Sequence, residues 1–232
     1  MTEIVNFELR DDVALIRMDD GKANAMSAPL LQGIDRALDR ALSEAKAVVL
    51  MGRPGRFSAG FDLKVMMSSP EAARALVLAG GEVLMRLYEH PQPLVVACTG
   101  HAIAGGVLMV ATGDVRIGVA GDFKLGLNEV ANGMPVPILA HELARDRLDP
   151  RAFVSSVLLA QLSDPEDAVR VGWLDRIVSA GELETSAIDQ AKALARLPQS
   201  AYALTKRSLR RKTVAYVRET VQQNLAEFTV GS

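Results

Sequence analysis

Short apolar strands alternate with helices through the first half of the chain, and this alternation restricts the fold more than any other feature of the sequence. We expect strands over residues 4–9, 13–18, 47–51, 94–99 and 115–119, and helices over residues 29–43, 70–88 and 105–112. Polar residues 10–12 between the first two strands indicate a hairpin. The later strands are separated by helices, and helical crossovers join parallel strands. The sequence therefore predicts an α/β fold whose ligand site lies at the carboxyl ends of strands.

The strand pattern fades after Pro137, and helices dominate the rest of the chain. Residues 163–166 (SDPE) have the pattern of a capping box with a proline in the first helical turn, and Gly172 is suited to end this helix. Two more helices are expected over residues 183–196 and 200–228. We accordingly divide the chain into a core domain, residues 1–175, and a C-terminal helical region, residues 176–232.

The composition is that of a self-sufficient core with no excess of charge. The 232 residues are 49% hydrophobic and 23% charged, enough apolar side chain to bury a core without metal or disulfides. A formal net charge of −2 gives no reason to expect nucleic acid or an anionic membrane as a partner. We expect no signal peptide in the first residues, and charged residues interrupt every apolar window of the length of a membrane span. We expect a cytoplasmic protein.

Two glycine-containing turns are expected where strands run into helices. They are residues 55–64 (GRFSAGFDLK) and residues 100–106 (GHAIAGG). The first N–H groups of a helix have no partner within the helix, so they bind anions or developing negative charge. If the N–H groups of Phe61 and Gly105 converge, they form a two-donor hole for a carbonyl oxygen that becomes an enolate. The spacing alone is equally compatible with two ordinary turns.

Other chemistry that uses glycine-rich loops requires residues that these turns lack. A phosphate-binding Walker loop needs a lysine where Gly106 stands, and neither turn has the Gly-x-Gly-x-x-Gly pattern of a dinucleotide site. A nucleophile elbow needs a glycine two residues before its serine, and Arg56 occupies that position before Ser58. The three histidines lack the spacing of metal ligands, so no metal site is expected.

Glu129 is the candidate catalytic residue. It follows the second turn in the apolar setting LGLNEV, residues 125–130. Partial desolvation among apolar neighbours raises the pKa of a carboxylate and makes it a stronger base. An exposed glutamate on an irregular segment is the alternative, and sequence alone does not decide between them.

These motifs resemble the crotonase superfamily, and the resemblance covers nearly the whole chain. The matching segments are residues 57–64 (FSAGFDLK), 104–106 (AGG) leading to 114–117 (DVRI), 126–129 (GLNE) and 201–206 (AYALTK). The resemblance implies a ββα superhelix with a helical C-terminal trimerisation region, and a homotrimer or dimer of trimers. It also implies an acyl thioester of coenzyme A as ligand, with the Phe61 and Gly105 N–H groups as oxyanion donors.

The resemblance also implies a set of residues that contact the thioester. These residues are Ala23, Ser58, Ala59, Asp62, Leu63, Lys64 and Leu108. Lys64 either approaches a phosphate or is a solvated lysine at a helix start. The basic run between Lys206 and Lys212 either meets coenzyme A phosphates or forms a solvated helix face.

Leu108 departs from the pattern of hydratases in this superfamily. Those hydratases carry a second glutamate three residues after the oxyanion glycine, and this sequence has Leu108 there. Adding water uses two carboxylates, whereas shifting a double bond needs one base that removes a proton at C2 and returns it at C4. The resemblance is therefore closest to the Δ3,Δ2-enoyl-CoA isomerases, which use no metal or redox cofactor. A hydratase that uses Glu129 alone and an acyl-CoA-binding protein with little activity remain the alternatives.

Overall fold

The computed structural model of the chain describes residues 3–227, and a six-stranded sheet forms its centre. In spatial order the strands are β1 (Val5–Arg10), β2 (Val13–Met18), β3 (Ala47–Met51), β5 (Leu94–Cys98), β7 (Val115–Val119) and β9 (Arg176–Val178). Strands β1 and β2 form the expected antiparallel hairpin, and every other pair in this sheet is parallel. The predicted α/β class is confirmed.

A second, three-stranded parallel sheet lies beside the first and was not predicted. Its order is β4 (Gly55–Ser58), β6 (Gly100–Ile103) and β8 (Leu125–Gly126). The expectation that residues 100–106 form a turn is therefore wrong for its first four residues. They form β6, which is separated from the end of β5 by Thr99 alone.

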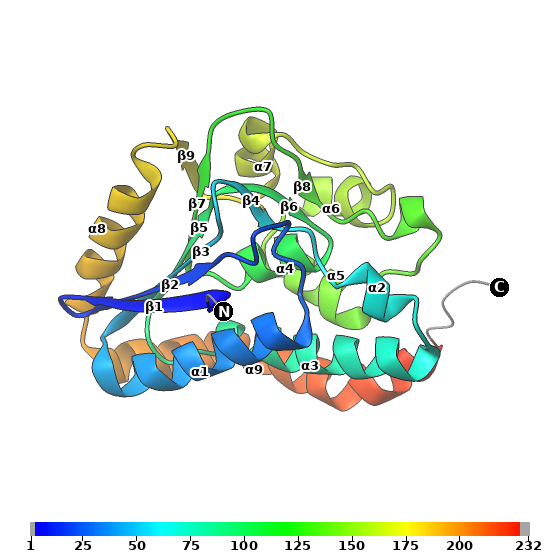
Figure 1. Cartoon of the computed structure of the whole chain (residues 1–232), viewed down its shortest axis with the longest axis horizontal. Coiled ribbons are helices and arrows are strands. Elements are labelled where there is room, and N and C mark those ends of the chain that lie inside the picture. The colour runs from blue at the N-terminus through cyan, green and yellow to red at the C-terminus, as the bar shows by residue number, and fades with distance from the viewer. Residues whose placement is uncertain (1–2, 228–232) are drawn as a thin grey trace.

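Helices cover both faces of the main sheet. The helices are α1 (Ala28–Glu44), α2 (Leu63–Met66), α3 (Pro70–Tyr88), α4 (Gly105–Ala111), α5 (Ile138–Arg145), α6 (Pro150–Val157), α7 (Pro165–Val171), α8 (Leu183–Ala195) and α9 (Gln199–Glu227), with a 3-10 turn at Val130–Asn132. Alternate residues of each strand point to opposite faces, so Val48 and Leu50 join the core with α1, α3 and α4, while Val49 packs under α8. Figure 1 shows α8 on one side of the sheet and α1, α3 and α9 together on the other.

The C-terminal third differs from the prediction in two details. Strand β9 extends the main sheet by pairing with β7, so residues 176–232 begin with a strand and not with a helix. Helix α7 is capped by Asp164, whose side chain accepts the N–H of Asp167, and not by Ser163. Ser163 instead pairs through its backbone with Leu125 of β8. A three-residue strand has too few apolar side chains to be detected before its partner is known.

The last helix, α9, begins as expected, and Phe228 lies outside the described residues. Among the helices formed by residues 3–227, none is long and apolar enough to cross a membrane.

Candidate active site

The candidate site lies at the carboxyl edge of the smaller sheet. Strands β4, β6 and β8 are parallel neighbours, so their carboxyl ends meet at one edge. The segments that directly follow these three strands contain Phe61, Gly105 and Glu129 in turn. Three segments far apart in the sequence are thus brought to the same place, which is where α/β folds bind ligands.

The N–H of Phe61 is aimed by a hydrogen bond on the other side of its own peptide. A trans peptide is planar, so its C=O and N–H point in opposite directions. The carbonyl oxygen of Gly60, which shares this peptide, accepts the N–H of Met26 at 2.8 Å. The Phe61 N–H therefore points away from Met26, and no residue of 3–227 accepts a hydrogen bond from it. The Gly60 N–H is held by Ser58 Oγ at 3.2 Å.

The N–H of Gly105 is aimed in the same way at the start of α4. The carbonyl oxygen of Ala104, which shares its peptide, accepts the N–H groups of Val107 at 3.1 Å and Leu108 at 3.3 Å. Gly105 is the first residue of the helix, so its own N–H has no intrahelical acceptor and points outward. Ala104 has φ of +52°, a conformation that costs energy for a residue with a Cβ. Strain of this kind is concentrated at functional sites.

Glycines allow the two donor loops to touch. A Cβ on Gly60 would lie 3.0 Å from the backbone nitrogen of Gly105, and a Cβ on Gly106 would overlap the carbonyl oxygen of Ser58. Any larger residue at these positions would push the loops apart. The structure thus brings the loops that contain Phe61 and Gly105 into contact.

Glu129 is tied to the second donor through the backbone. The N–H of Ala104, next to Gly105, donates to the carbonyl oxygen of Gly126 at 2.9 Å, and Glu129 follows three residues later. Its Oε2 is buried and has no hydrogen-bond partner among residues 3–227. Burial raises the pKa of Glu129, and backbone N–H groups of Asn128 and of Glu129 itself offset only part of this effect. This is the environment of a carboxylate that takes up protons readily.

Leu108 offers no second acid. It lies one turn into α4 from Gly105, is only 2% exposed and belongs to the main apolar core. The arrangement can therefore stabilise an oxyanion with two N–H groups and move a proton with one carboxylate.

Three of the predicted thioester contacts lie next to the donors. The N–H of Ala59 donates to the carbonyl oxygen of Ala23 at 3.0 Å, so these two residues lie side by side. Ser58 is buried, and its hydroxyl donates to the carbonyl oxygen of Asn24 at 2.7 Å. The strand end and the 23–24 segment thus form one wall beside Phe61.

Asp62, Leu63 and Lys64 lie at the start of α2, which follows the first donor, whereas the remaining predicted contact, Leu108, is buried on α4. Asp62 caps this short helix by accepting the N–H of Lys64 at 2.9 Å. Leu63 is 65% exposed, and the Lys64 side chain is exposed as well. The Lys64 side chain is therefore accessible both to solvent and to a phosphate.

Asn24 supports this wall in a way that the sequence analysis missed. It is fully buried with φ of +50°, and its side-chain amide donates to the carbonyl oxygens of Met18, Arg56 and Phe57. Asparagine tolerates positive φ better than most residues. An asparagine between two alanines after a polar loop was the available signal.

The basic run of α9 divides into buried and exposed cations. Lys206 Nζ lies 2.6 Å from Asp114 Oδ2, and Arg210 lies 2.7 Å from Asp114 Oδ1. Burial lowers the pKa of Lys206 to about 8, while the two cations hold the pKa of Asp114 below its usual value despite burial. Arg207, Arg211 and Lys212 are exposed. The run is therefore neither one solvated face nor a free set of phosphate ligands.

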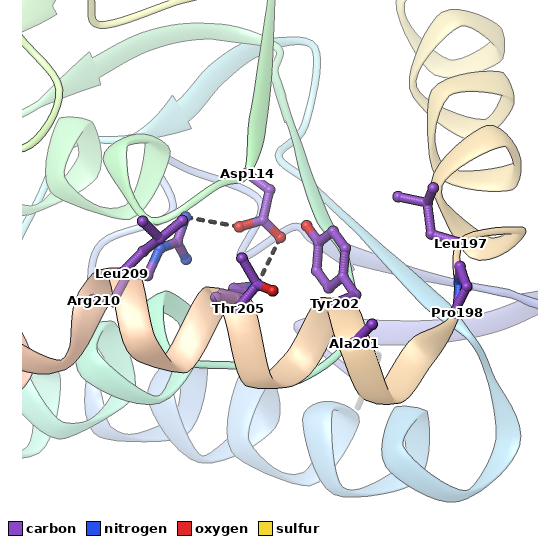
Figure 2. A pocket seen from close by; sticks show the side chains of 9 residues that line it. Asp114, Leu197, Pro198, Ala201, Tyr202, Thr205, Leu209 and Arg210 are labelled. Carbon is purple, nitrogen blue, oxygen red and sulfur yellow. Dashed lines mark hydrogen bonds and ion pairs between the residues drawn. The ribbon is translucent and has the colours of Figure 1, made fainter.

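Figure 2 shows Asp114 above α9, with Tyr202 and Arg210 on either side of it. A cavity of about 350 Å³ lies here beside the start of α9. Leu197, Pro198 and Leu209 form part of its apolar lining. These contacts anchor the C-terminal helix to the core.

Known proteins of one family are similar to this chain over most of its length. Residues 8–230 match the family model described as enoyl-CoA hydratase/isomerase. Human mitochondrial enoyl-CoA delta isomerase 1 is 29% identical over 224 residues, which are 93% of this chain and 74% of that protein. A probable enoyl-CoA hydratase of Bacillus subtilis (strain 168) is 31% identical over 189 residues, which are 79% of this chain and 71% of that protein.

Solved structures share the fold over the same range. An enoyl-CoA hydratase/isomerase family protein from Pseudomonas syringae has a TM-score of 0.95 at 40% identity, covering 97% of this chain and 98% of that chain. Human mitochondrial Δ3-Δ2-enoyl-CoA isomerase has a TM-score of 0.90 at 28% identity, covering 96% of this chain and 91% of that chain. With its crotonase fold and its paired donor loops, the chain belongs to the enoyl-CoA hydratase/isomerase family.

Proposed function

We propose that the protein is an enoyl-CoA isomerase, which moves the double bond of a 3-enoyl-CoA to the 2-trans position. One observation carries the proposal: Glu129 Oε2 is buried without a hydrogen-bond partner among residues 3–227, beside two aimed N–H groups, and the position of a second acid holds the apolar Leu108. Similarity to the human isomerase supports it.

In the proposed reaction, Glu129 serves as the only base and then as the only acid. Its carboxylate removes a proton from C2, and the electrons of that C–H bond spread over the thioester oxygen, C2 and C4. The N–H groups of Phe61 and Gly105 stabilise the negative charge on the oxygen. Protonated Glu129 then returns the proton to C4, so the C3–C4 double bond is lost and the C2–C3 double bond forms. Atoms and charge balance without water, metal or redox cofactor.

The environment of Glu129 suits both halves of this cycle. A raised pKa narrows the gap between the base and the carbon acid, which speeds the first transfer. The same raised pKa keeps the proton on Glu129 long enough to be returned. An ordinary exposed glutamate would lose it to water.

Hydration is the second candidate, because the Bacillus relative is named a probable hydratase. It would require a water that one carboxylate both holds and deprotonates while a proton reaches C2. A second carboxylate would share these tasks, and the apolar side chain of Leu108 cannot serve as one.

The test supplies a 3-enoyl-CoA and, separately, a 2-enoyl-CoA to the purified protein. We expect the absorbance of the conjugated thioester to appear from the first substrate. Glu129→Gln should abolish this while thioester binding stays within about threefold. Glu142→Gln is the matched control, because Glu142 is also a half-buried carboxylate, with a side chain 18% exposed, and is paired with Arg145.

Two outcomes would contradict the proposal. Loss of absorbance from the 2-enoyl-CoA, without any gain from the 3-enoyl-CoA, would assign a hydratase. Binding of both thioesters without turnover would assign an acyl-CoA-binding protein. We further propose assembly as a homotrimer or a dimer of trimers, which sedimentation equilibrium would measure directly.

A further inference from the structure

Met26 lies between the two donor loops and contacts both of them. It is fully buried and directly precedes the residues that start α1. Its N–H binds the carbonyl oxygen of Gly60 at 2.8 Å, and its backbone forms a parallel bridge with Phe61. The backbone of Met26 thus fixes the peptide that carries the first donor.

The side chain of Met26 reaches the second donor. A Cβ placed on Gly105 would lie 2.6 Å from Met26 Sδ, while its other near neighbours would be at an ordinary 3.5 Å. The methyl carbon of Met26 packs toward Gly80 of α3, where the ring of Phe61 also lies. One side chain therefore fills the space enclosed by Gly105, Gly80 and the Phe61 ring.

We propose that Met26 is a positioning residue for the oxyanion donors: its backbone aims the Phe61 N–H, and its thioether sets how closely the Gly105 N–H approaches. The inference deepens the proposed function, because both donors must lie about 2.7–3.1 Å from one oxygen to stabilise it. Peptide planes are rigid, so this spacing depends on what packs behind them. Met26 touches no reacting atom itself.

The first test shortens the side chain and compares it with a buried methionine elsewhere. Met26→Val ends one atom short of Sδ, whereas Met26→Leu places a methyl carbon where Sδ lies. We expect kcat on a 3-enoyl-CoA to fall about 10- to 100-fold in Met26→Val, with KM within about threefold, and to stay within about threefold of the parent in Met26→Leu. Met85→Ala is the control, since Met85 is 1% exposed on α3 and should lose thermal stability but not kcat.

The second test measures how strongly the two N–H donors polarise the carbonyl of a bound thioester. It requires no turnover, so it also works if the isomerase assignment fails. Cinnamoyl-CoA is a conjugated thioester whose absorbance shifts to the red when hydrogen bonds polarise its carbonyl. We expect the parent protein and Met85→Ala to produce the full shift, and Met26→Val to produce less than half of it. A full shift with Met26→Val, or no shift with the parent, would overturn the proposed role of Met26.

A double variant tests the contact with Gly105 directly. Gly105→Ala should lower both readouts, because its new Cβ meets Met26 Sδ. Adding Met26→Val removes the obstructing atom, so the double variant should be more active than Gly105→Ala alone. If the two effects simply multiply, the two residues are independent, and the proposed contact is refuted.

Discussion

Asp114→Asn tests whether the inward-facing cations of α9 are structural. The carboxylate is only 11% exposed: Oδ2 accepts from Lys206 and from the Leu94 N–H at 2.7 Å, Oδ1 pairs with Arg210, and the carboxylate also accepts a hydrogen bond from Tyr202. Asparagine has nearly the same shape. With its oxygen at the Oδ2 position it keeps the contacts with Lys206 and the Leu94 N–H and presents an NH2 group to Arg210. The buried Arg210 then faces a donor in place of the Asp114 carboxylate.

The magnitude follows from the burial of the pair. Removing one member of a buried ion pair costs about 3–5 kcal/mol, because the remaining charge is left uncompensated. For a chain of this size each kcal/mol lowers Tm by about 2–4 °C, so we expect a fall of roughly 6–20 °C. Asp167→Asn is the control, because the Asp167–Arg170 pair is exposed and should change Tm by less than about 3 °C.

Circular dichroism gives Tm, and steady-state kinetics at 25 °C give KM for the thioester. We expect Asp114→Asn to lower Tm with KM unchanged, since Lys206 and Arg210 are occupied by Asp114 in the folded protein. A rise in KM with a Tm near that of the parent would refute this reasoning. It would show that these cations bind the substrate.

Two further predictions concern the site and its wall. Only ionised Glu129 is a base, and burial raises its pKa, so kcat/KM should fall with decreasing pH. In a pH–rate profile we expect the midpoint of this fall to lie above the ordinary glutamate pKa of 4.5. A midpoint at or below 4.5 would contradict the burial argument. Asn24→Ala removes the side-chain amide that donates to the carbonyl oxygens of Met18, Arg56 and Phe57 and accepts the Asp20 N–H, and it should cost about 2–4 kcal/mol in urea unfolding. A cost under about 1 kcal/mol would mean that water replaces the amide.

Local apolar patterns were sufficient to predict the main strands and the long helices. Strands β3 and β5 are continuous apolar runs, and α1 and α3 carry apolar residues at helical spacing. Strands β4, β6 and β8 have no such pattern. They are two to four residues long and contain Gly55, Gly100 and Gly126, each with positive φ, so only their pairing with one another defines them.

The chemistry of the site was predictable as residue types but not as geometry. Family motifs identified Phe61, Gly105 and Glu129, and the structure brings the segments that contain them to one sheet edge. The burial of Lys206 on α9 and its ion pair with Asp114 could not be predicted, because Asp114 lies 92 residues before Lys206 in the sequence.

The sequence by itself determined which elements form, which family motifs the chain carries and that Leu108 replaces a second acid, because these depend on residue identity and short-range spacing. Only the tertiary structure decided where the donor N–H groups point. That direction depends on which atom binds the carbonyl on the far side of each peptide, and for Phe61 this atom belongs to Met26, from a distant part of the chain. Burial of Glu129 is likewise a property of the folded surroundings and not of its neighbours in sequence.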